Sequence, residues 1–233
     1  MKRINSIDFT RGIVMIIMAL DHVRDLLHTD SLTQSPTDLA TTTPAIFFTR
    51  WITHLCAPVF VFLAGTSVFI SLQNKANPDE ARNKLLKRGF WLLFLEFTIV
   101  NFGIYFDWRF NTILLGVVAA IGIGFIILSL LLKLRPLTIG IIGLSIILLH
   151  GLIPSIPFAE GSLGKTILSP FFQTIVIPLP AKKIFITAYP PVPWLGIMLF
   201  GYGSGKILQL NMADRKNNCF FMGQIEFKDL FVS

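Results

Sequence analysis

Apolar residues occur along the chain in long runs, each closed by a short polar or charged stretch. The runs are Ile7–Leu27, Trp51–Leu72, Phe90–Phe106, Ile113–Leu132, Leu137–Ile153 and Trp194–Leu210. A helix needs about 20 mostly apolar residues to cross the hydrocarbon core of a bilayer. In lipid it also satisfies its own backbone hydrogen bonds. The pattern therefore predicts an all-α fold, a polytopic transmembrane helix bundle of about six spans.

Two longer segments interrupt this pattern. His28–Arg50 is rich in Ser, Thr and Asp and is predicted to be a polar loop. Pro154–Pro193 is rich in proline, and connections of that length are usually functional or partly re-entrant. We expect it to cover the outer face, with Phe171–Leu179 as a candidate half-helix that dips inward. Residues 1–210 are predicted to form one membrane domain, and residues 211–233 an atypical tail.

The composition excludes an ordinary soluble domain. Hydrophobic residues make up 53% of the chain and charged residues 14%, whereas soluble domains average about 25% charged. Most of the 20 Lys and Arg residues fall in segments on the same side as the N-terminus, a bias that marks cytoplasmic loops. We therefore expect a multi-pass protein of the cytoplasmic (inner) membrane with a cytoplasmic N-terminus. The +7 net charge then needs no nucleic acid as partner, and the lipid bilayer is the expected one.

Ionisable residues cluster at the outer end of the first run, at Asp21, His22, Arg24 and Asp25. An ionisable side chain at membrane depth costs about 2.5–3.5 kcal/mol on insertion scales, so it normally faces a partner or a cavity. Asp21 and Asp25 are spaced i,i+4, which places both carboxylates on one side of a helix. This stretch is the first candidate for a functional site.

The second run starts with its own polar end, which contains Arg50 and His54. Because this run enters from the outer side, His54 is expected at nearly the same depth as His22. The two runs can pack as a hairpin, so their polar ends can meet. His150 ends the fifth run on the same side, where a solvated histidine is also common.

Such a cluster suits proton handling, because histidine titrates near about pH 6.5 and a neighbouring carboxylate can fix its tautomer. An imidazole there could deprotonate an amine or a hydroxyl, or be acylated itself. Arg50 could bind an anion or balance the two aspartates. The same charges could equally form an ion-pair network that only holds the bundle together. The two cysteines and four histidines lack zinc-ligand spacing, so no metal is expected.

Four segments resemble a known family of membrane proteins. They are Ser6–Gly12 with Met18–Asp25, Pro36–Leu39 with Thr43 and Pro44, Phe48–His54 running into Ala57–Ser67, and Tyr189–Gly196 with Gly201 and Gly205. Together they resemble the bacterial branch of the heparan-α-glucosaminide N-acetyltransferase catalytic-domain family, over about residues 3–210. The resemblance also implies that the chain ends early, since family members usually continue with further spans.

The resemblance implies transfer of an acyl group, acetyl above all, from cytosolic acetyl-CoA to a sugar amine or hydroxyl of an extracytoplasmic envelope glycan. His22 and His54 would then be the candidate base or acyl carrier, oriented by Asp21 and Asp25. The candidate substrate-binding residues are Arg50, Arg24 and Asp38.

Two other readings stay open. Glu96 lies in the middle of the third run, and acids and histidines at membrane depth also suit a proton relay. A proton-coupled transporter or exporter of an envelope precursor is therefore the alternative, and a truncated, inactive family member is another. A homo-oligomer is compatible with any of the three.

Overall fold

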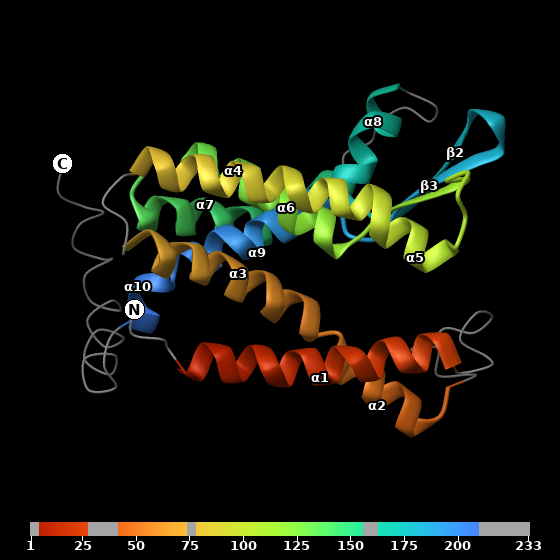
Figure 1. Cartoon of the computed structure of the whole chain (residues 1–233), viewed down its shortest axis with the longest axis horizontal. Coiled ribbons are helices and arrows are strands. Elements are labelled where there is room, and N and C mark those ends of the chain that lie inside the picture. Colours follow the sequence, from red (N-terminus) through yellow and green to blue (C-terminus); the bar gives the residue numbers. More distant parts are fainter. Residues whose placement is uncertain (1–4, 28–41, 74–77, 156–162, 210–233) are drawn as a thin grey trace.

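The computed structural model describes residues 5–27, 42–73, 78–155 and 163–209, and its architecture is mostly helical (Figure 1). The α-helices are α1 (Asn5–Leu27), α2 (Pro44–Thr53), α3 (Cys56–Gln73), α4 (Pro78–Leu95), α5 (Asn101–Tyr105), α6 (Val117–Leu131), α7 (Pro136–Leu149), α8 (Leu163–Phe172), α9 (Pro191–Gly203) and α10 (Gly205–Gln209). A π-helical turn, η1 (Glu96–Val100), joins α4 to α5. Two 3₁₀ turns are η2 (His150–Ser155) and η3 (Pro180–Lys182).

The second predicted span, Trp51–Leu72, is divided in two, and helix begins before it. The predicted polar loop is therefore wrong for Pro44–Arg50, which belongs to α2. Thr43 caps α2, its hydroxyl accepting from the Ile46 N–H at 3.4 Å, and Pro44 occupies the first turn, where its missing N–H costs nothing. The helix then breaks after Thr53 and resumes as α3 at Cys56. Pro58 explains the break, because it has no N–H to donate to the His54 carbonyl.

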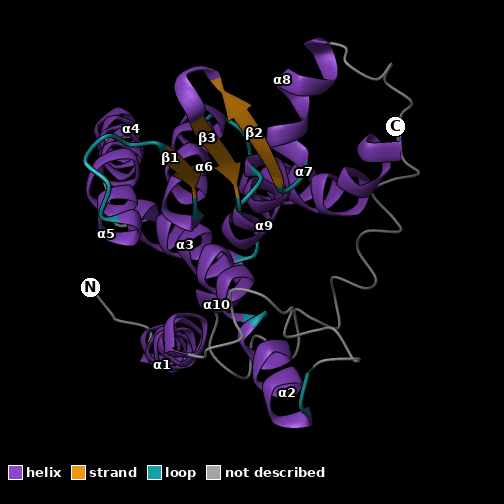
Figure 2. Cartoon of the chain, turned by 90° about the vertical axis from the view of Figure 1, so that its right-hand side faces the viewer, coloured by secondary structure: helices purple, strands orange, loops and turns teal. Residues whose placement is uncertain are grey.

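The all-α expectation is wrong in one respect, since the described chain contains a three-stranded sheet in the order β1-β3-β2 (Figure 2). Strand β1 (Thr112–Leu115) pairs parallel with β3 (Lys183–Thr187), and β2 (Ile175–Leu179) pairs antiparallel with β3. The predicted span Ile113–Leu132 included most of β1, because the apolar residues of β1 continue into those of α6. Gly116, in an extended conformation, separates the two elements.

The expected half-helix Phe171–Leu179 is also wrong for most of its length. Helix α8 ends at Phe172, and Ile175–Leu179 forms strand β2 instead. The run is rich in β-branched residues, which favour a strand. Its partner β3 follows directly after the tight turn η3, where Ala181 and Lys182 adopt positive φ angles.

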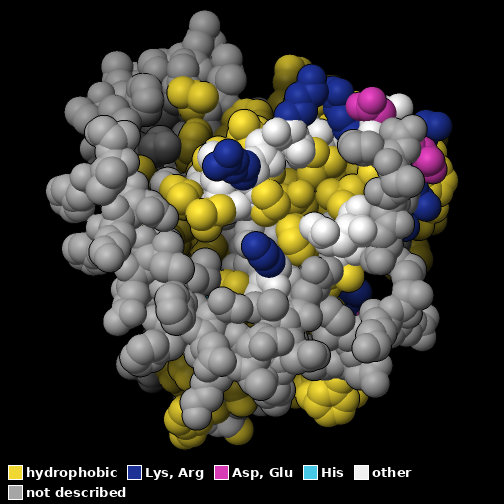
Figure 3. All heavy atoms as spheres, turned by 90° about the vertical axis from the view of Figure 1, so that its left-hand side faces the viewer, with side chains coloured by type: hydrophobic (Ala, Val, Ile, Leu, Met, Phe, Trp, Pro, Cys, Tyr) yellow, Lys and Arg dark blue, Asp and Glu magenta, His cyan; other side chains and the backbone are white. Residues whose placement is uncertain are grey.

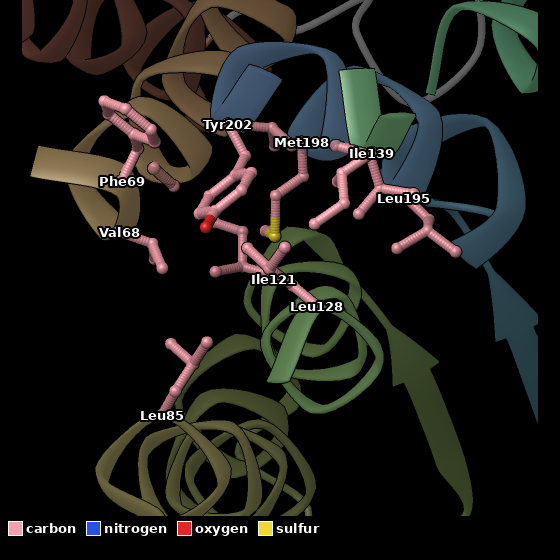
Figure 4. Close-up of a cluster of buried hydrophobic side chains, with 12 residues drawn as sticks. Val68, Phe69, Leu85, Ile121, Leu128, Ile139, Leu195, Met198 and Tyr202 are labelled. Carbon is pink, nitrogen blue, oxygen red and sulfur yellow. The ribbon is translucent and has the colours of Figure 1, made fainter. Parts of the chain in front are cut away.

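Helix α9 lies at the centre of the bundle and packs against α3, α6 and α7, while α4 packs against α6. Apolar side chains from these five helices converge in the core shown in Figure 4, including Leu85, Leu128, Ile139, Met198 and Tyr202. Their close packing holds the five helices together, because many small dispersion contacts sum to a large attraction.

Helix α1 packs against α2 and α3 only along one side, and runs beside the main bundle (Figure 1). Its other side exposes large apolar residues, among them Phe9 at 70% and Ile16 at 74%. By length and composition, one described helix, Pro44–Gln73 with its kink included, could cross a bilayer, and Val117–Leu131 and Pro136–Leu152 are shorter apolar helices. The six spans and their orientation stay predictions.

Candidate functional site

A pocket of about 610 Å³ lies where α1 ends and where α3 and α9 begin. Helix α2, the end of α7 and the segment after β3 complete its walls. The pocket therefore collects residues that are far apart in the sequence. It also lies at the end of the bundle where the sequence predicts the outer side of the membrane.

Asp21 of α1 is the centre of a charged cluster in this pocket. Nη1 of Arg50, on α2, donates to both of its carboxylate oxygens at 3.1 and 3.2 Å. The Thr53 hydroxyl donates to Asp21 at 2.6 Å, and Arg24, one turn further along α1, donates as well. The polar ends of the first two spans thus meet through Asp21 and Arg50.

Two of the histidines line the pocket. His54, in the break between α2 and α3, and His150, just after α7, both contribute to its walls. Nδ1 of His150 lies 2.7 Å from the Ile147 carbonyl oxygen. His22 is exposed and is not part of the pocket wall, because it lies about 100° around α1 from Asp21.

The cluster differs from the predicted one in the partners of the Asp21 carboxylate. Among the described residues, no imidazole bonds to Asp21; its oxygens are taken by the two arginines and Thr53. Asp25 lies in α1, and its side chain is outside the described part of the structure, as are His28 and Asp38 entirely.

An aromatic pair that the sequence reading did not assign to the site forms the opposite wall. Tyr189 and Trp194, at the start of α9, lie with ring centroids 5.0 Å apart and both line the pocket. Tryptophan is common at membrane interfaces, so the residue type of Trp194 alone does not indicate a site. The sequence feature that could have indicated this pair is the Tyr189–Gly196 motif, because its prolines begin α9 and so place both rings at one helix start.

A second pocket, of about 520 Å³, lies between α1, α3, α4 and α6. Three basic residues, Arg11, Lys84 and Arg88, line it together with Ser67 and Ser71, and the rest of its wall is apolar. Arg11 is held by α3, donating to the Leu63 carbonyl at 3.3 Å and to the Ser67 hydroxyl. Figure 3 shows the end of the molecule where Lys and Arg side chains surround an apolar surface.

Glu96 belongs to neither pocket. It is only 1% exposed, and its Oε1 accepts from the Gly116 N–H at 2.7 Å, at the start of α6. A helix start has unpaired N–H groups and a partial positive charge, so a carboxylate there is stabilising. Glu96 therefore acts as a cap for α6. Within the described residues, no cluster of His, Cys, Asp or Glu could hold a metal ion.

A comparison with protein families shows which family the chain belongs to. The family described as heparan-alpha-glucosaminide N-acetyltransferase, catalytic, matches residues 3–228. The chain belongs to this family. An acetyltransferase-type function follows from membership. No curated protein and no solved structure matches the chain.

Proposed function

We propose that the chain transfers an acetyl group from acetyl-CoA, bound from the basic end, to a sugar amine or hydroxyl of an extracytoplasmic glycan bound in the pocket around Asp21. The observation that carries the proposal is the convergence of Asp21, Arg50, His54 and His150 in one pocket of a chain that belongs to an acetyltransferase family. The proposal has two halves. In the acceptor half, the sugar binds in the pocket around Asp21, called the acceptor pocket. In the donor half, acetyl-CoA binds in the pocket lined by Arg11, Lys84 and Arg88, called the basic pocket.

The acceptor half is supported by the chemistry of the pocket wall. The paired rings of Tyr189 and Trp194 offer an apolar platform for the carbon face of a sugar ring, and attract an ammonium group over their faces. Arg50, His54 and Thr53 offer polar groups for hydroxyls on the sugar's edge. An apolar surface with a few converging polar groups is the usual composition of a small-molecule site.

The donor half is supported by the second pocket. Arg11, Lys84 and Arg88 suit the phosphates of coenzyme A, because arginine binds phosphate through paired, charge-assisted hydrogen bonds. Its apolar wall suits the less polar arm that carries the acetyl group. Arg11 and Asp21 lie on the same helix, about 15 Å apart along its axis, so an extended donor can reach from one pocket toward the other.

The test is transfer of label from acetyl-labelled acetyl-CoA to a panel of amino sugars, using the full chain in membranes. We expect label in the sugar product. Trp194→Ala should raise the KM for the sugar, with Trp91→Ala, an exposed tryptophan outside both pockets, as its control. Arg88→Gln should raise the KM for acetyl-CoA, whereas Lys87→Gln, its exposed neighbour outside the pocket, should not.

The two histidines predicted from the sequence are compared in the same assay. His54→Ala should reduce transfer because His54 lines the pocket, and His22→Ala tests whether the other face of α1 takes part. Folded protein that labels no acceptor would remove the proposal. The transporter alternative loses its support from Glu96, which caps a helix rather than lining either pocket; that alternative predicts substrate flux driven by a pH gradient.

A further inference from the structure

The neutral imidazole of His150 is held in one tautomer by the backbone. Its Nδ1 lies 2.7 Å from the Ile147 carbonyl oxygen, one turn back at the end of α7. A carbonyl oxygen accepts hydrogen bonds and never donates them, so Nδ1 is the atom that carries the proton. Nε2 is then the nitrogen with the free lone pair, and it belongs to a side chain that lines the acceptor pocket.

His54, the other imidazole of this pocket, has no such support. Within the described part of the chain no hydrogen bond or ion pair to its ring is found, and its side chain is exposed. Asp21 does not orient it, since the Asp21 oxygens are bound by Arg24, Arg50 and Thr53. A base works best when a second group fixes its tautomer and ring orientation, and His150 meets that requirement.

We propose that His150 Nε2 is the proton acceptor for the attacking sugar group, a catalytic role that the sequence reading gave to His22 or His54. The inference rests on the proposed acetyl transfer. The sugar nitrogen or oxygen attacks the thioester carbonyl carbon, and the carbon–sulfur bond breaks as the new amide or ester bond forms. The proton lost by the sugar group passes to Nε2 and then to the departing thiolate, which leaves as free coenzyme A.

The decisive variant is His150→Asn, because its amide nitrogen can take the place of Nδ1 and keep the bond to the Ile147 carbonyl while removing the base. His150→Ala removes both. Leu148→Ala changes a 70% exposed neighbour outside the pocket and serves as the control. All are measured as full chain in the same detergent, with the thermal midpoint recorded for each.

We expect His150→Asn to keep the wild-type thermal midpoint and to lose about 10²- to 10⁴-fold in kcat, with a small change in the KM for acetyl-CoA. The acidic limb of the pH–rate profile should disappear, and added imidazole should restore part of the rate. The other titratable groups of the pocket, namely Asp21, Arg50, His54 and Tyr189, are unchanged in this variant, so any limb that they cause remains.

Three results would overturn the inference. A folded His150→Asn variant with wild-type kcat shows that His150 serves only to cap the end of α7 through its bond to the Ile147 carbonyl. A loss of rate with the acidic limb intact and no rescue by imidazole shows a positioning effect. Wild-type protein that transfers no acetyl group overturns this inference and the proposed function together, whereas an active wild type with an active His150→Asn overturns this inference alone.

Discussion

Asp21 shows how a single ionisable residue is accommodated within an apolar helix. Its side chain is 18% exposed and is held by two guanidinium groups, of which Arg24 belongs to its own helix and Arg50 to the next. Removing one partner of a buried ion pair costs more than the pair contributes, because the other charge stays desolvated. The cluster thus stabilises the α1–α2 hairpin and also charges the wall of the pocket.

Replacing Asp21 by Asn tests this directly. The change removes the charge shared by Arg24 and Arg50 while keeping an oxygen for Thr53. We expect the free energy of unfolding to fall by about 2 kcal/mol, less than for a fully buried pair because Arg50 is 30% exposed. That loss lowers the thermal midpoint by about 4–8 °C for a chain of this size.

The matched control is Asp8→Asn on the same helix. Asp8 is 56% exposed and lies 4.0 Å from Arg11, so its ion pair is screened by solvent. Its free energy of unfolding should stay within about 0.5 kcal/mol of the wild-type value. Equal losses in the two variants would contradict a special role for Asp21.

At the scale of elements, glycines set how closely the helices approach. A Cβ added to Gly201 of α9 would lie 2.2 Å from the Phe62 carbonyl oxygen of α3, and one added to Gly65 would lie 2.0 Å from the Met198 carbonyl oxygen. Such contacts are impossible without moving the helices apart. Small residues allow this close approach, which is typical of helix packing in membranes.

Gly201→Ala should therefore destabilise the bundle by about 1–3 kcal/mol through overpacking. Gly12→Ala is the control, because no atom outside its own helix lies within 4 Å of a Cβ there. Alanine favours a helix over glycine by about 0.5–1 kcal/mol, so Gly12→Ala should match or exceed the wild-type midpoint. Thermal unfolding in one detergent compares the two variants.

The cap on α6 is a second element-scale interaction. Glu96→Gln keeps an oxygen for the Gly116 N–H and should cost about 1 kcal/mol or less, whereas Glu96→Ala leaves that buried N–H unpaired and opens a cavity, at about 2–4 kcal/mol. The measurement is the thermal midpoint of each variant, and we expect the midpoint of Glu96→Ala to lie below that of Glu96→Gln. A Glu96→Ala variant as stable as Glu96→Gln would show that the cap contributes nothing.

At the scale of the whole molecule, the two pockets lie toward different ends of α1, at Arg11 and at Asp21. The basic pocket lies on the side that the Lys and Arg bias assigns to the cytoplasm. If the chain crosses the membrane in this sense, the donor enters from the inside and the acceptor from the outside. The proposed reaction then needs no movement of the whole glycan across the bilayer.

Orientation can be measured with single cysteines in a background where Cys56 and Cys219 are replaced by serine. Trp108→Cys, at a position 74% exposed between α5 and β1, should react with a membrane-impermeant thiol reagent on intact cells. Lys87→Cys on α4 should react only after the membrane is opened. Labelling of Lys87→Cys on intact cells would reverse the predicted topology.

Local sequence was sufficient for much of this fold. The apolar runs predicted where most of the helices form, because a helix satisfies its backbone hydrogen bonds within its own segment, whatever its neighbours are. The break in the second span also has a local cause, because Pro58 has no N–H to donate. The motif Asp21–Asp25 and the polar segment Arg50–His54 were predicted to lie close together, since a hairpin of adjacent spans brings them to the same depth.

Tertiary structure decided what depends on partners distant in the sequence. Strand β1 forms because β3, about seventy residues later, supplies its hydrogen bonds, and no local pattern shows that pairing. Glu96 became a cap because the start of α6 packs beside it. His150 lines the same pocket as Asp21 because α7 packs on α9, whose first turn also lines that pocket. The sequence determined which side chains carry charge, and packing determined which of them share a cavity.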